Sequence, residues 1–289
     1  MKVTLLKPEG YCAGVTNAIN IAYEAKRNNI DKDVYILGML VHNETVIKEL
    51  SENGITTLYR DKISEENILY NLKEGSVVIF SAHGHRKELD KIAEEKHFIV
   101  YDATCPKVMK NLAIIDKEIS QGHDVIYIGH KDHPEALAAL SHGNKVYFYD
   151  IKNEFNYKQV KDKSPLVINQ TTLNTKELKD IYIDIIVNKP KARILDEICA
   201  ATRLRQEAVI NIPSDTNLIL IIGDKKSSNT NRLLEIAKTF YSNIPSYLIS
   251  NVDELKEIEI DHEANIAIAS GASTPKKEID SVVSYLSNL

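Results

Sequence analysis

Three cysteines, the only ones in the 289-residue chain, are spaced almost equally along it. Cys12 and Cys105 are 93 residues apart, and Cys105 and Cys199 are 94 residues apart. Each cysteine begins a stretch with helical periodicity, and the N-terminus of a helix favours negative charge such as that of a thiolate. Equivalent corners of three structural repeats can meet on a pseudo-threefold axis. The spacing therefore predicts a metal site formed by three thiolates.

The type and number of these ligands favour an iron–sulfur cluster over zinc. Structural zinc usually has four protein ligands, often in paired C-x-x-C motifs, and this sequence has no such pair. A four-iron cluster held by three cysteines leaves one iron open to substrate. His42, His83 and His133 could complete a different ligand set, so zinc stays an alternative. Another alternative is that the cysteines are small buried residues without chemistry.

Polar residues recur at equivalent places around the three cysteines, which indicates internal repetition. The strand-like run after each cysteine ends at a glycine: Gly38, Gly129 and Gly223. Four residues beyond each glycine is a polar residue that precedes a helix: His42, His133 and Ser227. The fourth strand-like run of each segment ends in SAHG, NQTT or SGAST, which contribute His83, Thr171 and Ser273.

Two of these polar loops favour a bound anion. Ser227, Ser228 and Asn229 lie at the start of the helix that follows the apolar run NLILII. Ser273 precedes Pro275, a residue type favoured in the first turn of a helix. Free N–H groups and hydroxyls at helix N-termini bind phosphate. The pattern predicts a diphosphate site, and simple helix capping is the alternative.

Glu135 is the one obvious acid among the repeated polar loops, two residues after His133. An acidic residue in the first turn of a helix is commonly a partner of the helix dipole. Beside an open iron, Glu135 would instead be a proton donor with a pKa tuned for work near neutral pH.

Composition and charge argue against several classes of protein. A net charge of −5 with mixed signs does not provide the basic face that nucleic-acid binding needs. No apolar run approaches the roughly 20 residues of a membrane span, and no signal sequence is visible. An odd number of cysteines fits a reducing compartment. We expect a cytoplasmic protein that binds neither nucleic acid nor membrane.

Apolar runs such as SVVIFSA and NLILIIG alternate with helical stretches such as RKELDKIAEE along the whole chain. Strands without a polar face that are joined through helices belong in parallel sheets covered on both sides. The sequence therefore predicts an α/β protein of three repeats, each with a mainly parallel four-stranded sheet. The expected domains are 1–104 with Cys12, 105–197 with Cys105, and 198–289 with Cys199.

Several motifs together resemble the bacterial 4-hydroxy-3-methylbut-2-enyl diphosphate reductase family. The matching segments cover essentially the whole chain: GYCAGV, SAHG, DATCPKV, QTTL, DEICAATRLRQEA, KKSSNTNRL and GAST. The resemblance implies a trefoil of three α/β domains around one 4Fe-4S cluster per chain. The implied cluster ligands are Cys12, Cys105 and Cys199.

The resemblance also implies the reaction and the roles of the other site residues. The family reduces 4-hydroxy-3-methylbut-2-enyl diphosphate to isopentenyl and dimethylallyl diphosphate, using two electrons and two protons at the cluster's open iron. The implied diphosphate ligands are His42, His83, Ser227, Asn229 and Ser273, with Ser228 and His133 close by. Glu135 and Thr171 would lie beside the substrate hydroxyl, with Glu135 as the acid. Since the chain has no G-x-G-x-x-G pattern, a ferredoxin or flavodoxin is the expected electron donor.

Two positions depart from the family pattern, and two other functional classes stay open. Leu204 stands where an asparagine is usual, and His85 stands where an apolar residue is commoner. One alternative function is a non-catalytic iron–sulfur or zinc protein that acts as a sensor or scaffold. The other is a thiol-dependent enzyme with Cys12 as the nucleophile.

Overall fold

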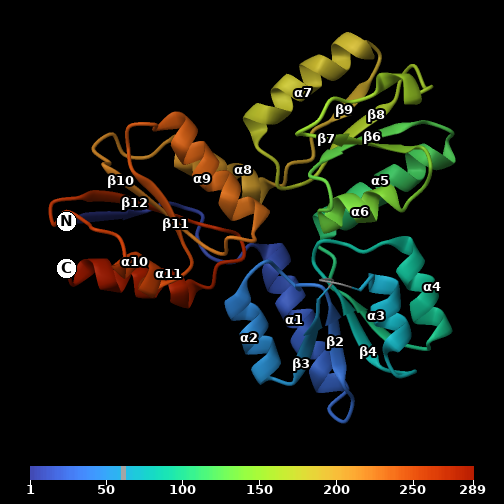
Figure 1. Cartoon of the computed structure of the whole chain (residues 1–289), viewed down its shortest axis with the longest axis horizontal. Helices are drawn as coiled ribbons and strands as arrows, with labels where there is room; N and C mark the ends of the chain where they lie inside the picture. Colours follow the sequence, from blue (N-terminus) through green and yellow to red (C-terminus); the bar gives the residue numbers. More distant parts are fainter. Residues whose placement is uncertain (60–62) are drawn as a thin grey trace. The chain divides into compact units, whose positions relative to one another are not determined.

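Residues 1–59 and 63–289, the part that this computed structural model describes, contain three parallel β-sheets of four strands each (Figure 1). Sheet A has the order β1-β12-β10-β11, sheet B the order β3-β2-β4-β5, and sheet C the order β7-β6-β8-β9. Every neighbouring pair of strands is parallel. The predicted α/β class and the four-stranded parallel sheets are confirmed.

The strands are short, and their bounds are as follows. Sheet A contains β1 Lys2–Leu5, β10 Leu218–Ile222, β11 Ser246–Ile249 and β12 Asn265–Ser270. Sheet B contains β2 Val34–Leu37, β3 Ile55–Leu58, β4 Val77–Phe80 and β5 Ile99–Asp102. Sheet C contains β6 Val125–Gly129, β7 Val146–Asp150, β8 Leu166–Asn169 and β9 Arg193–Leu195.

Crossover segments join consecutive strands, as parallel pairing requires, and each contains an α-helix except the one between β7 and β8. In the first half of the chain the helices are α1 Ala13–Asn28, α2 Glu44–Glu52, α3 Glu65–Asn71, α4 Lys87–Glu95, α5 Pro106–Ser120 and α6 Pro134–Leu140. In the second half they are α7 Thr175–Asn188, α8 Ala200–Ile210, α9 Ser228–Phe240, α10 Val252–Lys256 and α11 Lys276–Ser287, with a 3₁₀ turn at Tyr157–Gln159. No helix in the described ranges is long and apolar enough to cross a membrane.

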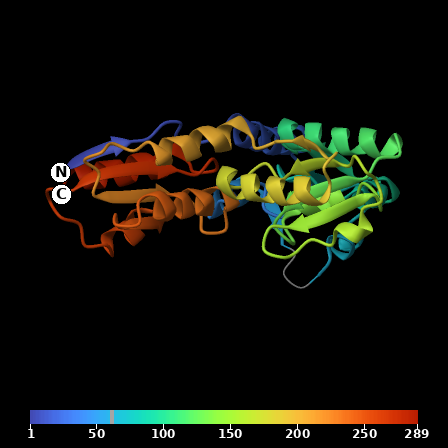
Figure 2. The ribbon, with the colours of Figure 1, turned by 90° about the horizontal axis from the view of Figure 1, so that it is seen from above.

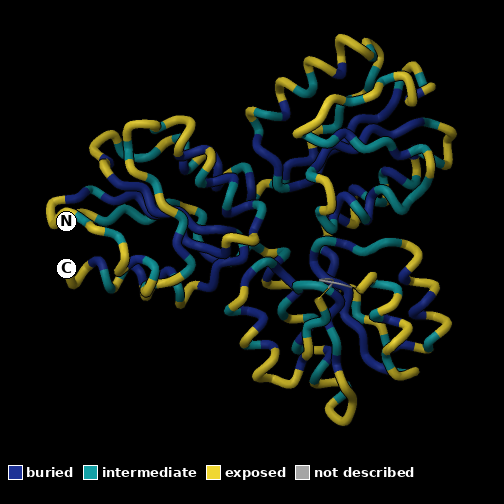
Figure 3. The backbone as a smooth tube through the Cα atoms, viewed as in Figure 1, coloured by how far each residue is buried: buried dark blue, intermediate teal, exposed yellow. Residues whose placement is uncertain are grey.

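Sheet A shows why the inner strands are apolar on both faces. Leu220 and Ile222 of β10 pack with side chains of α10 and α11, whereas Ile219 and Ile221 pack with side chains of α8 and α9. The whole of β10 is buried, and Figure 3 shows the same dark interior in each sheet. Because successive side chains point to opposite faces, helices on both sides leave no solvated face for polar residues.

The first strand of the chain belongs to the last sheet. Residues Lys2 to Leu5 of β1 pair with Asn265 to Ile268 of β12, so the two chain ends lie at the same end of sheet A (Figure 2). Two compact units result. Unit 1 comprises Met1–Val15, His42–Val46 and Cys199–Leu289, and unit 2 comprises Thr16–Val41 and Ile47–Ile198. The domain boundaries 1–104, 105–197 and 198–289 stay a prediction.

Candidate active site

Each cysteine follows an edge strand and lies at the start of the next helix. Cys12 follows β1, and its N–H donates to the carbonyl oxygen of Ala272 at 3.0 Å. Cys105 follows β5, and its N–H donates to the carbonyl oxygen of Ala82, also at 3.0 Å. Ala272 and Ala82 belong to the GAST and SAHG loops. Cys12 and Cys105 therefore share a hydrogen-bonding pattern as well as a place in the sequence repeat.

Cys199, in unit 1, caps the helix that it begins. Its Sγ accepts a hydrogen bond from the Thr202 N–H at 3.3 Å and lies 3.1 Å from the Thr202 hydroxyl. All three cysteines are partly exposed rather than buried. A cysteine that served only to fill the core would be fully buried.

Arg205 is a buried cation beside two of the cysteines. Its guanidinium donates to the carbonyl oxygen of Gly10 at 2.6 Å, and its Nε has no hydrogen-bond partner among the described residues. Burial lowers the pKa of Arg205, whereas the sulfurs of Cys12 and Cys199 act to raise it. The two cysteines of unit 1 therefore favour the positive charge of Arg205.

The predicted anion-binding residues of unit 1 lie on adjoining loops. Ser227 caps α9 by accepting from the Thr230 N–H at 3.3 Å. The Ser273 hydroxyl donates to the carbonyl oxygen of His42 at 3.0 Å. Asn229 is 6% exposed, and neither its Oδ1 nor its Nδ2 has a partner among the described residues. A buried amide costs free energy unless it is hydrogen-bonded, so Asn229 is a candidate ligand-binding group.

Two glycines allow the loop before α9 and the GAST loop to lie close to each other. A Cβ at Gly271 would overlap the Thr230 hydroxyl, and a Cβ at Gly223 would come within 2.8 Å of the hydroxyls of Thr230 and Thr274. Gly223 also has a φ of +151°, which few other residues adopt. The glycine after β10 thus brings the start of α9 against the GAST loop.

Glu135 of unit 2 lies in the first turn of α6 but is only 3% exposed. Its Oε1 accepts from the Thr171 N–H at 2.9 Å and from the Tyr127 hydroxyl at 3.2 Å. Its Oε2 lies 3.0 Å from the Thr171 hydroxyl. Burial raises the pKa of Glu135 to about 7, although these hydrogen bonds act to lower it. The carboxyl can therefore gain and lose a proton near neutral pH.

Two predicted histidines lie next to this carboxyl group. His133 caps α6, and its Nδ1 accepts from the Glu135 N–H at 3.2 Å. The ring of His83 meets the ring of His133 edge-on, with centroids 5.9 Å apart. Gly84 follows with a φ of +85°, and a Cβ there would press on Ala138 of α6. Unit 2 thus gathers His83, His133, Glu135 and Thr171.

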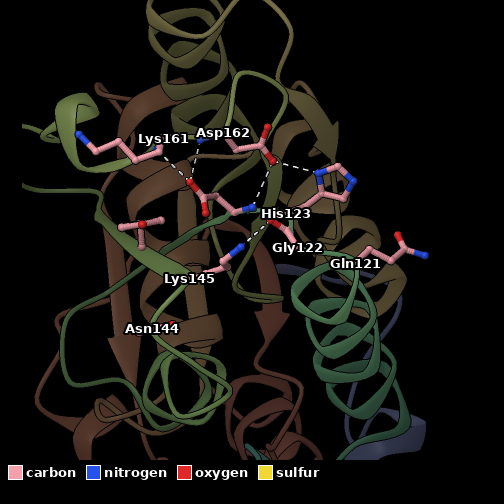
Figure 4. A pocket seen from close by; sticks show the side chains of 9 residues that line it. Gln121, Gly122, His123, Asn144, Lys145, Lys161 and Asp162 are labelled. Atoms are coloured by element: carbon pink, nitrogen blue, oxygen red, sulfur yellow. Dashed lines mark hydrogen bonds and ion pairs between the residues drawn. The ribbon is translucent and has the colours of Figure 1, made fainter.

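A surface pocket of about 510 Å³ lies at the other end of β6 (Figure 4). Asp124, which precedes β6, accepts from the N–H groups of Lys161 and Asp162 at 2.9 Å. His123 is 3.0 Å from Asp162, and Lys145 donates to Gly122. These polar groups bind one another. The polar loops that hold Glu135 and Thr171 are instead at the carboxyl ends of the strands, where parallel α/β sheets bind ligands.

Sequence reasoning missed two polar residues in these networks. In the sequence, Tyr127 has the pattern of an apolar strand residue, and Arg205 lies in the RQEA segment without an assigned role.

The two residues that depart from the family pattern, His85 and Leu204, lie in ordinary surroundings. His85 stacks on Phe80 at a centroid distance of 3.8 Å and lies 2.9 Å from Asp90, and Leu204 is 51% exposed. In the described ranges, no group of three His, Cys, Asp or Glu side chains is arranged to hold one metal ion.

Comparison with known proteins decides the family, because the model described as "LytB protein" matches residues 3–287. The chain belongs to the LytB family. The 4-hydroxy-3-methylbut-2-enyl diphosphate reductase of Bacillus pumilus is 37% identical over 290 residues, covering 100% of this chain and 91% of that protein. The enzyme of that name from Geobacillus thermodenitrificans is 35% identical, with coverage of 99% and 90%.

Solved structures agree with this LytB assignment. The E-1-hydroxy-2-methyl-but-2-enyl-4-diphosphate reductase of Plasmodium falciparum has a TM-score of 0.87 and 28% identity, covering 99% of this chain and 88% of that one. A second solved structure, an (E)-4-hydroxy-3-methyl-but-2-enyl diphosphate reductase described as the terminal enzyme of the non-mevalonate pathway, has a TM-score of 0.70. Its identity is 28%, and both chains are fully covered. The chain therefore has the family's fold along its whole length.

Proposed function

We propose that this LytB protein reduces 4-hydroxy-3-methylbut-2-enyl diphosphate to isopentenyl and dimethylallyl diphosphate with two electrons and two protons. The chain is an oxidoreductase by its family, and its relatives are named for this substrate. The observation that carries the proposal is the buried carboxyl of Glu135, which Thr171 contacts at both oxygens and whose pKa burial raises to about 7. Loss of a hydroxyl as water needs a proton on the departing oxygen, and such a carboxyl can provide it.

The three cysteines are proposed to hold one 4Fe-4S cluster per chain. The donor set fits: each cysteine lies at the start of a helix, where negative charge is favoured, and the positive charge of the buried Arg205 interacts favourably with Cys12 and Cys199. The Nε of Arg205 is a buried donor without a hydrogen-bond partner among the described residues. When bound by three cysteines, such a cluster supplies electrons and one iron that is open to a substrate hydroxyl.

Unit 1 is proposed to bind the diphosphate. Ser227, Asn229 and Ser273 offer hydroxyl and amide groups beside the N–H groups of the α9 helix start, with His42 and Ser228 on the same loops. His83, on the SAHG loop of unit 2, is proposed as a further ligand. Holding the diphosphate uses binding energy away from the reacting bond to position the hydroxyl.

Glu135, Thr171 and His133 are proposed to act at the hydroxyl end of the substrate. Thr171 accepts or donates at Oε2 of Glu135, so the threonine hydroxyl can pass a proton between the carboxyl and the substrate. His133 accepts the Glu135 N–H through Nδ1, which leaves Nε2 as the protonated nitrogen of a neutral ring. These residues hold and move the proton.

The proposal predicts how turnover depends on pH. A general acid must be protonated, so the rate should be high below the Glu135 pKa of about 7 and fall as the pH rises through it. Stopped-flow or steady-state rates from pH 5.5 to about 9 with saturating donor check this. A rate that rises through this range would contradict the assignment of Glu135 as acid.

Asn229→Ala should weaken substrate binding without weakening the fold. The amide makes no hydrogen bond in the described structure, so its removal breaks none. A lost hydrogen bond to a charged group costs about 1.5 to 3 kcal/mol, which corresponds to roughly 10- to 150-fold weaker binding. Titration of the cluster's absorbance with substrate measures the affinity, and urea unfolding measures stability.

Asn251→Ala provides the matched control for Asn229→Ala. Asn251 caps α10 in the same unit by accepting from Asp253 and Glu254 at 2.9 and 3.0 Å. Its removal should cost about 1 kcal/mol of stability and leave substrate affinity unchanged. If Asn229→Ala binds substrate with unchanged affinity, the buried amide does not contact the substrate.

The proposed function is tested by anaerobic purification and turnover. The expected protein is brown, contains roughly four irons per chain, and forms both diphosphate products when supplied with a reduced ferredoxin or flavodoxin. Dithionite with a viologen dye serves as a donor that needs no docking surface. A cluster without turnover under either donor would favour a sensor, and turnover by a metal-free chain would favour a thiol enzyme.

A further inference from the structure

Tyr127 lies inside sheet C, where a phenylalanine would meet every packing need. Its ring packs among Ile115 of α5, Ala136 and Ala139 of α6, and Ile168 of β8. The side chain is 1% exposed. A hydroxyl in such a place costs free energy unless it is hydrogen-bonded, and the bond that meets this need is to Glu135 Oε1 at 3.2 Å. The hydroxyl therefore has a partner in the proposed acid.

The neighbouring glycine leaves space for this ring. A Cβ at Gly129 would lie 3.3 Å from Cε1 of Tyr127 and 3.1 Å from Oε1 of Gln170. Gln170 Oε1 in turn accepts from the His130 N–H at 3.1 Å. Gly129 ends β6, so the small residue allows the tyrosine and the loop after β8 to lie against the same carboxyl.

The two oxygens of Glu135 are unequal. Oε1 accepts from the Thr171 N–H, which can only donate, and from the Tyr127 hydroxyl. A proton on Oε1 would have to displace one of these donors. Oε2 instead faces the Thr171 hydroxyl, which can donate to a carboxylate or accept from a carboxylic acid.

We propose that Tyr127 is a positioning residue for Glu135: its buried hydroxyl occupies Oε1, so that the transferable proton resides on Oε2 beside the Thr171 hydroxyl. This inference rests on the proposed function, in which Glu135 is the acid. Tyr127 acts through Glu135 and is not itself placed against the substrate.

Charged and titratable groups from every neighbouring element bear on this carboxyl. Tyr127 reaches it from β6, and His133 contacts its backbone N–H at the start of α6. Lys107 of α5 acts on it through its positive charge and also pairs with Glu197. Burial and the carboxyl of Glu135 raise the pKa of Tyr127 well above its usual value, so the phenol stays protonated and donates.

Tyr127→Phe is the test, in the anaerobic holoenzyme. A donor that binds the carboxylate lowers its pKa, so removing the hydroxyl should raise the Glu135 pKa and move the high-pH limb of turnover upward by about one pH unit. Maximal turnover should fall by at most about tenfold, because the proton now also occupies Oε1. The KM for substrate should stay unchanged, since Tyr127 is not on a diphosphate-binding loop.

Tyr149→Phe is the matched control. Tyr149 lies on the adjacent strand β7, is 8% exposed, and donates to a different carboxyl, that of Asp184, at 3.0 Å. It loses the same type of bond outside the site and should leave the pH profile of turnover unchanged. A profile in Tyr127→Phe that superimposes on the wild-type profile overturns the proposal.

Two further measurements separate this inference from the proposed function. Infrared titration of the Glu135 carboxyl band, assigned by its loss in Glu135→Gln, reports the proton without any turnover. An unchanged titration in Tyr127→Phe overturns the proposal even if rates change. A shifted titration together with an enzyme that does not act on the substrate would contradict the proposed function alone.

A second substitution keeps the test possible if Tyr127→Phe does not fold. 3-Fluorotyrosine at position 127 is a stronger hydrogen-bond donor, so it should move both the infrared titration and the pH profile of turnover to lower pH. No movement of either would again overturn the proposal.

Discussion

Replacing Cys12, Cys105 or Cys199 singly by serine should abolish turnover and degrade the cluster. A hydroxyl is a poor substitute for a thiolate on iron, because iron–sulfur clusters are held by soft thiolate ligands. Iron and sulfide content per chain, with the visible absorbance of the anaerobic protein, measures the loss. We expect the iron content to fall far below the roughly four of the intact protein.

The Cys199→Ser variant is the most informative of the three. In the structure, Cys199 Sγ accepts from the Thr202 N–H at 3.3 Å as the cap of α8, and serine is among the best residues for this role. The metal-free variant should therefore fold at least as stably as the metal-free wild type. Lost iron in a folded protein would then report a lost ligand.

A control for the cysteine variants changes a helix cap away from the sulfurs. Asn174 caps α7 by accepting from the Lys176 N–H at 2.8 Å, and Asn174→Ser should keep both the cap and the iron. A cysteine variant with unchanged iron and full turnover would remove that residue from the ligand set.

The fully buried strands were all predicted from their apolar runs, whereas two of the partly exposed edge strands were not. The runs at Val77–Phe80 and Leu218–Ile222 are buried throughout and are apolar at every position. The edge strands Ile55–Leu58 and Arg193–Leu195 were not predicted, since Thr56 and Arg193 are exposed and the strands are only four and three residues long. Local pattern carries little signal in a short, half-solvated strand.

The pairing of β1 with β12 also lies beyond local pattern. The run VTLL predicts a strand, but nothing within it specifies a partner that begins 263 residues later, at Asn265. The strands of sheet B all follow Cys12 and those of sheet C all follow Cys105. In sheet A, β10, β11 and β12 follow Cys199, and β1 from the other end of the chain completes the sheet. The spacing reveals the repetition without revealing which strand completes which sheet.

The site residues show the same division between residue type and environment. The sequence indicated Glu135 as an acid but could not show that it is 3% exposed, because a first-turn glutamate is usually solvated. Tyr127 and Arg205 gain their significance only from tertiary neighbours, a carboxyl in one case and two sulfurs in the other. Burial and partners, which depend on the whole fold, change the chemistry of each group.

Glu135→Gln should fold, keep its cluster and bind substrate nearly normally, while turnover falls by roughly 100- to 10,000-fold, the range expected for loss of a general acid. Glutamine is nearly the same size, and its amide oxygen can still accept from the Thr171 N–H and the Tyr127 hydroxyl at the Oε1 position. Its NH₂ group can donate to the Thr171 hydroxyl but cannot release a proton at neutral pH. The high-pH limb of the rate should disappear with the carboxyl.

Glu177→Gln separates the acid from a helix-dipole role. Glu177 is also a first-turn glutamate, on α7 of the same unit, and has no assigned role in the reaction. Suppose that Glu135 only interacts favourably with the dipole of α6. Each of the two substitutions would then lower the free energy of unfolding by a few tenths to about 1 kcal/mol, and both variants would turn over at the wild-type rate. Single-turnover rates and urea unfolding of both variants decide between these outcomes. Wild-type turnover in Glu135→Gln would place the proton source elsewhere, with His133 or the substrate's own diphosphate as the next groups to test.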